Sequence, residues 1–284
     1  MFLASMVLAL DMVHVWTFNA GSTVEGLACS GKTVAIGTSD GSGYVVSCNG
    51  TYLSQIKALA SMNDVSYCCG KYAFVSSDNN IYLTTENGKL ITKIPISFKY
   101  NEAVILTPKG ILACSSSCAF FNMKGKLIWS FDLGKIAGEP SYYKDYAYVP
   151  DVAGKELLIL NLTDGKKVGE VFFGEPVYTS DVCGNLLVVG GQKDVYLFNL
   201  TDPTDPKYLW DFNIPGFVGD VKFSPDCNYI AVINMAKNYV HIYDINGQIL
   251  YSKYFDEPVT AITWGKGLVV GLQDGTVEAF NVTR

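Results

Sequence analysis

The chain is poor in the residues that most enzymes and nucleic-acid-binding proteins depend on. It has two histidines, His14 and His241, and no run of Lys or Arg. Its 27 acidic and 21 basic residues give a net charge of −6. A nucleic-acid partner needs a basic face that displaces counterions, so we expect no such partner. The sequence shows no Ser-His-Asp constellation, no Cys-His constellation and no glycine-rich phosphate loop. We therefore expect no catalytic residues.

An apolar run long enough to span a bilayer is also missing. The N-terminal segment MFLASMVLAL is too short to cross a membrane and has no basic residue before it. We expect residues 1–11 to form an apolar extension that lies as a short strand or tail against the folded domain, and we expect no transmembrane segment. Two alternatives stay open, a remnant of a secretory signal or a translation start at Met12.

The eight cysteines lack the paired C-x-x-C spacing of a zinc site. Most of them fall in or beside predicted strands, where a free cysteine behaves as a small buried hydrophobe. We therefore expect reduced core cysteines, no metal site, no cofactor and a cytoplasmic location. One or two disulfides are the alternative reading of the cysteines, and export is the alternative location if the N-terminal segment is a signal remnant.

What the chain does contain is a strand pattern that returns about every 41 residues. Three copies of one strand are Val195-Tyr-Leu-Phe198-Asn199, Val240-His-Ile-Tyr243-Asp244 and Val277-Glu-Ala-Phe280-Asn281. Each unit contains four strands, here called a to d, with polar turns between them. A period of this size, filled with β-branched and aromatic alternation, is typical of a propeller blade.

The last unit is incomplete, and the missing strand lies at the other end of the chain. After Asn281 only three residues remain, whereas His14-Val-Trp16-Thr-Phe18 matches strand d of earlier units, such as Leu209-Trp210-Asp-Phe212. Six whole units and one shared unit predict an all-β, seven-bladed β-propeller with four antiparallel strands per blade. Residues 12–284 would form this single domain, and the N-terminal strand would complete the last blade.

One unit resembles a blade of the WD-repeat family. It has the turn Phe223-Ser-Pro-Asp226 between strands a and b, and strand c ends in Tyr243-Asp244. Gly125-Lys-Leu-Ile-Trp129 is similar to the quinoprotein type of blade. The Gly-His dipeptide of WD repeats is absent, so the hydrogen-bond network of that family is not expected. The resemblance implies a propeller, a fold whose commonest role is protein binding.

Two sets of acidic residues recur at fixed positions of the repeat. In a propeller the d-to-a loops and the b-to-c turns share one face, so both sets should surround one mouth of the channel. Clustered carboxylates would attract a basic peptide or a divalent cation. Turn chemistry alone is the alternative explanation. The acids before strand a are Glu102, Glu139, Glu175 and Glu257, and those between strands b and c are Asp40, Asp78, Asp151, Asp194 and Asp274.

Two further patterns have a structural and a functional interpretation. Trp16, Trp129 and Trp210 share one position on strand d, which indicates packing between blades, or else an aromatic rim for a partner. Asparagines 49, 161, 199 and 281 satisfy the N-glycosylation sequon, three of them at one repeat position where a turn favours Asn.

From the sequence we expect a non-catalytic protein–protein interaction platform, WD-repeat-like, that uses the acidic channel mouth. Its partner would be a protein or a basic peptide, and the propeller would be a monomer within a larger complex. The alternative is an enzyme with its site in the channel, either a metal-dependent lyase or lactonase or a quinoprotein-like oxidoreductase.

Overall fold

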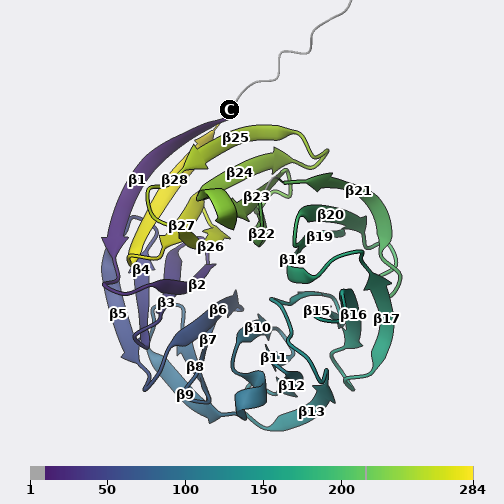
Figure 1. Ribbon diagram of the computed structural model, residues 1–284. Coiled ribbons are helices and arrows are strands. Elements are labelled where there is room, and N and C mark those ends of the chain that lie inside the picture. The colour runs from purple at the N-terminus through teal and green to yellow at the C-terminus, as the bar shows by residue number, and fades with distance from the viewer. Residues whose placement is uncertain (1–9, 215, 284) are drawn as a thin grey trace, which may run out of the picture.

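A computed structural model describes residues 10–214 and 216–283, and within them 28 strands form seven four-stranded antiparallel sheets. The sheets stand around a central channel as the blades of a propeller (Figure 1). The predicted fold class, the number of blades and the closure of the last blade are therefore confirmed. Blades one to six follow in sequence order from β2 to β25, and blade seven combines β26, β27 and β28 with β1.

Each blade uses its four strands in the order a, b, c and d from the channel to the rim. The a strands are β2 (Val24–Cys29), β6 (Met62–Cys68), β10 (Ala103–Thr107), β14 (Ser141–Tyr143), β18 (Val177–Cys183), β22 (Val218–Phe223) and β26 (Val259–Trp264). The b strands are β3 (Thr33–Thr38), β7 (Lys71–Ser76), β11 (Gly110–Cys114), β15 (Tyr146–Asp151), β19 (Leu186–Gly191), β23 (Tyr229–Asn234) and β27 (Leu268–Leu272). The c strands are β4 (Ser42–Ser47), β8 (Asn80–Thr85), β12 (Ser117–Phe121), β16 (Glu156–Asn161), β20 (Asp194–Asn199), β24 (Tyr239–Asp244) and β28 (Thr276–Thr283). The d strands are β5 (Tyr52–Lys57), β9 (Leu90–Pro95), β13 (Leu127–Asp132), β17 (Lys167–Phe172), β21 (Lys207–Asn213), β25 (Ile249–Tyr254) and β1 (Asp11–Asn19).

Two short 3₁₀ helices interrupt the strands. Helix η1 (Phe98–Tyr100) lies in a d-to-a loop, and η2 (Met235–Lys237) lies in a b-to-c connection. Neither of these, the only helices among the described residues, is long and apolar enough to cross a membrane.

Ring closure depends on β1, which pairs with β28 in an antiparallel register from Asp11↔Thr283 to Asn19↔Thr276. Leu10 and Met12 are buried in a cluster with side chains of blades six and seven. The rest of the predicted apolar extension, residues 1–9, lies outside the described residues. Because β28 has a partner on each side, the last blade leaves no unpaired c strand.

Trp16, Trp129 and Trp210 hold neighbouring blades together, as the packing interpretation predicts. The Nε1 of Trp129 donates a 2.8 Å hydrogen bond to the carbonyl of Leu162, in the c-to-d turn of the next blade. Trp16 and Trp210 make the same bond, to the carbonyls of Cys48 and Ile245. The core is accordingly built from clusters of buried apolar residues that span adjacent blades.

The expectation of reduced core cysteines is wrong for four of the eight. Cys114 and Cys118 are register partners on β11 and β12 and form a disulfide. Cys183, at the end of β18, and Cys227, in the turn after β22, form a second disulfide between blades five and six. Burial in strands does not prevent bridging here. The antiparallel register places the Cα atoms of Cys114 and Cys118 4.2 Å apart, and the contact between blades places those of Cys183 and Cys227 5.5 Å apart.

Candidate functional site in the central channel

Polar side chains enter the channel because strand a is the inner edge of each sheet. An edge strand has backbone N–H groups without a partner strand, and these groups need other acceptors. Asp64 accepts a 2.8 Å hydrogen bond from the amide of Val104 in the next blade. In the same way Asp181 accepts from the amide of Phe223 at 2.7 Å. These carboxylates therefore join consecutive a strands, and they also line the channel.

In the channel an ion pair joins blade four to blade six past the inner strand of blade five. Lys222 on β22 contacts Glu139, which lies in the segment leading into β14, and it also contacts Oδ1 of Asp220 at 3.1 Å. The backbone fixes Glu139, since its amide donates to the carbonyl of Tyr178 at 2.7 Å and its carbonyl accepts from the amide of Ser180 at 3.0 Å. The side chain of Lys222 is 16% exposed and that of Glu139 is 34% exposed, so the pair is partly buried.

The ion pair lies between two cavities, because Leu27, Glu139 and Lys222 line both of them. The narrow chamber, about 60 Å³, is lined by the first halves of a strands and therefore lies toward the d-to-a loops. The wide chamber, about 330 Å³, is lined by the second halves and lies toward the a-to-b turns. Lining residues of the narrow chamber include Glu25, Asp64, Asp220 and Thr260, and those of the wide chamber include Tyr67, Tyr142, Asp181, Phe223 and Trp264.

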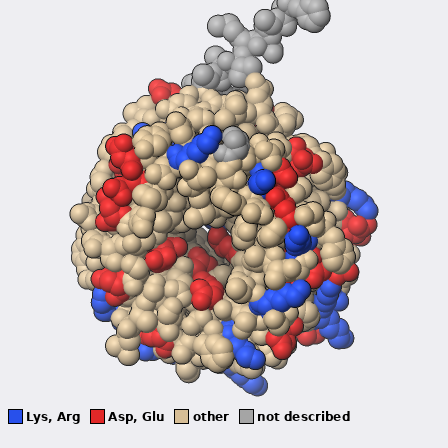
Figure 2. Space-filling view, viewed as in Figure 1, with Lys and Arg blue, Asp and Glu red and all other residues tan. Residues whose placement is uncertain are grey.

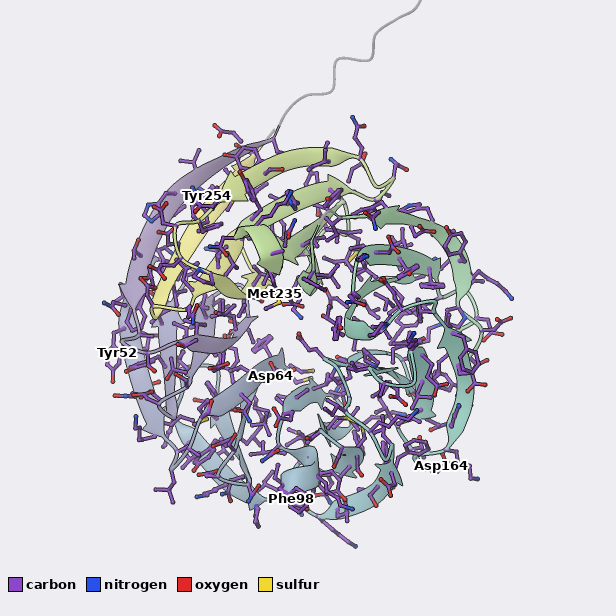
Figure 3. All side chains as sticks on the ribbon, viewed as in Figure 1. Tyr52, Asp64, Phe98, Asp164, Met235 and Tyr254 are labelled. Carbon is purple, nitrogen blue, oxygen red and sulfur yellow. A yellow bond between two sulfur atoms is a disulfide. The ribbon has the colours of Figure 1, made fainter. Side chains whose placement is uncertain are left out.

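Carboxylates outnumber bases in the channel. Five acids, Glu25, Asp64, Glu139, Asp181 and Asp220, accompany the single base Lys222 among the lining residues of the two chambers. Figure 2 shows acidic side chains around the central opening, and in Figure 3 Asp64 lies beside it. When these acids are ionised, their excess over the single base gives the channel interior a negative charge.

Burial and the closeness of the charged groups to one another shift the pKa values of the carboxyls and of Lys222. Burial, with Glu139 nearby, raises the pKa of Asp220 to about 7 and raises that of Asp64 well above its ordinary value. Burial raises the pKa of Asp181 to about 6, although Lys222 and the Phe223 amide oppose the rise. Burial alone would lower the pKa of Lys222, but the surrounding carboxylates outweigh it and raise that pKa well above its ordinary value. The channel thus holds an ammonium and several readily protonated carboxyls.

Of the five acids between strands b and c, Asp40, Asp151 and Asp274 cap their own turns by accepting from backbone amides. Asp40 accepts from the hydroxyl of Thr38 at 2.7 Å and from Nζ of Lys57 at 2.9 Å. Asp78 accepts from the Tyr82 hydroxyl, Asp151 from the Gly154 amide, Asp194 from the Asn213 side chain and Asp274 from the Thr276 amide. Turn chemistry thus accounts for three of the positions, while Asp78 and Asp194 bond side chains of neighbouring strands. The predicted role of all five in binding stays a prediction.

The four acids before strand a do not gather in one place. Glu139 lies in the channel, and Glu102 is near enough to Glu25 to help raise the pKa of that carboxyl, after burial. Glu175 turns away and accepts from the amides of Lys193 and Asp194, both at 2.9 Å. Glu257 lies in a separate pocket together with Asp274 and Lys253. Of the predicted set, the structure brings only Glu102 and Glu139 to the channel region.

Sequence reasoning missed the charged residues inside the a strands. Asp64 and Asp220 occupy the same position, since each precedes a Val and stands two residues after the first residue of its strand. Aspartate is disfavoured in strands, so its recurrence in Asp64-Val65 and Asp220-Val221 was the available signal. Lys222 carried a similar signal, as a base within a strand that lines the channel.

Two comparisons with known proteins add no family to this description. Neither family models nor curated proteins give a match to the chain.

Among the described residues no group of three or more His, Cys, Asp or Glu side chains is placed to hold a metal ion. The site is therefore interpreted from its own geometry.

Proposed function

We propose that the protein is a non-catalytic interaction platform that receives a lysine or arginine side chain from a protein partner at the narrow chamber. The observation that supports this function is the excess of carboxylates over Lys222 in the channel. Glu25 is exposed at the mouth, while Asp64 and Asp220 lie deeper. A cationic group would move from exposed Glu25 toward Asp64 and Asp220, and its attraction to their charges in the lower dielectric would favour the ionised form of both carboxyls.

The size of the narrow chamber limits what can enter. Its volume is only about 60 Å³. An ammonium or guanidinium head fits this space, whereas the rest of the partner must stay outside. This match favours a basic peptide segment that inserts a single side chain over a larger ligand buried in the chamber.

The two disulfides bear on the location of this platform. Disulfides persist in oxidising compartments and are rare in the cytosol. Cys114–Cys118 and Cys183–Cys227 therefore favour the exported alternative over the cytoplasmic one. The four sequons are compatible with export, although Asn161 and Asn199 also cap their own turns by accepting from the amides of Thr163 and Thr201.

The binding test uses hexapeptides with one central lysine and matched peptides in which that lysine is acetylated. Fluorescence anisotropy should show binding of the lysine peptides and loss of binding on acetylation. Substituting Glu25→Gln together with Asp64→Asn should weaken binding at least tenfold, since each removed carboxylate takes away about 1 kcal/mol or more of attraction.

A matched control is Asp181→Asn, because Asp181 lines the wide chamber and not the narrow one. This variant should bind the lysine peptides as the unaltered protein does. Equal binding of acetylated and unmodified peptides, or an unaltered affinity in the Glu25→Gln/Asp64→Asn variant, would contradict the proposed function.

A further inference from the structure

The wide chamber has the size and lining of a small-molecule site. Its volume of about 330 Å³ falls within the usual range of roughly 300–1,000 Å³ for such sites. Four aromatic residues line it, Tyr67, Tyr142, Phe223 and Trp264, and of these Phe223 also belongs to a buried core cluster. Aromatic walls bind apolar bodies, and their π faces also attract cations.

The charged residues of the wide chamber lie at its inner end, where it meets the ion pair. They are Glu139, Asp181 and Lys222, and among the lining residues of this chamber Lys222 is the only base. Its ammonium group already contacts Glu139 and Asp220. When Glu139 and Asp181 are both ionised, their two negative charges face the single positive charge of Lys222. One negative charge in the chamber is then uncompensated.

Asp181 is the carboxylate best placed to interact with a ligand. Its Oδ2 accepts the Phe223 amide at 2.7 Å, which fixes the side chain on the wall of the chamber. Among the described residues it has no ion-pair partner within 4.0 Å, whereas Glu139 pairs with Lys222. The indole of Trp264 is also fixed, since its Nε1 donates to the carbonyl of Lys222 at 3.1 Å. The charged and aromatic parts of the chamber are thus held in place before any ligand arrives.

We propose that the wide chamber binds a small organic cation, an amine or amidine carried on an aromatic or aliphatic body. The charged nitrogen would pair with Asp181, and the body would lie against Tyr67, Tyr142 and Trp264. An anion is disfavoured because it would face Asp181 and Glu139 while Lys222 is already paired. The volume of about 330 Å³ lies at the small end of the range for such sites, which suits a compact ligand rather than a peptide.

This site is independent of the proposed peptide site. The two chambers lie on opposite sides of the Lys222–Glu139 pair, and Asp64 and Asp181 line different chambers. One chamber could bind its ligand even if the other bound none.

The test measures binding of phenethylamine, tryptamine and benzamidine to the whole protein by isothermal titration calorimetry, with phenylethanol and benzamide as neutral counterparts. We expect at least one of the cations to bind one to one with a Kd below about 1 mM, and its neutral counterpart to bind at least tenfold more weakly. Asp181→Asn should weaken that cation at least tenfold, whereas Asp64→Asn should leave its affinity unchanged.

A second variant keeps the test decisive if Asp181→Asn fails to fold. Tyr142→Ala removes part of the aromatic wall and no charge, and it should also weaken binding of the cation several-fold. The proposal is overturned if none of the three cations binds below about 1 mM or if the neutral compounds bind equally well. It is also overturned if folded Asp181→Asn and Tyr142→Ala bind normally, or if Asp64→Asn weakens binding as much as Asp181→Asn does.

Discussion

At the scale of single residues, the buried carboxylates make stability depend on pH. Burial raises the pKa of Asp181 to about 6, whereas an aspartate in an unfolded chain titrates near 3.9. The folded state therefore holds the proton more tightly than the unfolded state does. The stabilisation from that proton is fully present below pH 4 and is lost as the pH rises through about 6.

Asp181→Asn should remove this dependence on pH. In the unaltered protein, ionisation of Asp181 should lower the free energy of unfolding by about 1.4 kcal/mol between pH 5 and pH 8. The amide cannot ionise, so the stability of the variant relative to the unaltered protein should rise by that amount over the same interval. Urea unfolding at the two pH values measures the change, and a constant difference between the two proteins would contradict the assigned shift.

At the scale of strands and turns, tryptophans on the d strands couple each blade to its neighbour. Gly165 lies in the c-to-d turn of blade four at φ +73°, directly against the indole of Trp129. A Cβ atom at Gly165 would lie 2.6 Å from two ring carbons. Gly134 has a similar φ of +67°, but a Cβ atom there would meet nothing within 4 Å. Substituting Gly134 therefore tests backbone strain alone, whereas substituting Gly165 tests backbone strain together with packing between blades.

Gly165→Ala should destabilise the protein more than Gly134→Ala does. Each substitution places an alanine at positive φ, which costs about 1–2 kcal/mol. Gly165→Ala additionally forces the Trp129 ring to move, which typically costs about 1–3 kcal/mol more. Urea unfolding of both variants measures the difference. Equal losses of unfolding free energy in the two variants would mean that the turn at Gly165 does not pack tightly against the Trp129 indole.

The same scale shows what the sequence could and could not predict. Strand alternation and turn residues recur in every unit, so local chemistry predicted the blades and the capping role of acids such as Asp40. The pair Lys222–Glu139 joins residues 83 positions apart across an intervening blade, so no local pattern contains it. Disulfide Cys183–Cys227 likewise depends on contact between blades. Cys114–Cys118 follows from a hairpin register that the sequence pattern did not define.

At the scale of the whole molecule, strand β1 turns a row of blades into a closed ring. A row of repeats has two open ends, and each end lacks half of its neighbour contacts. Pairing of β1 with β28 removes the open edge of the last blade, and Trp16 carries the contact onward to the Cys48 carbonyl in blade one. Trp16 therefore contributes to two connections, one within blade seven and one from blade seven to blade one.

Trp16→Ala should open the ring at this junction. We expect a loss of about 3–5 kcal/mol in the free energy of unfolding, as for other buried tryptophans. Trp210→Ala is the matched control, since Trp210 makes the same hydrogen bond between blades five and six. Amide hydrogen exchange should then accelerate in β1 and β28 for Trp16→Ala, and in β21 and the Ile245 turn for Trp210→Ala, because local opening begins where contacts are removed. If β28 kept its protection in Trp16→Ala while the protein lost stability, closure through the N-terminal strand would not be what holds the last blade in place.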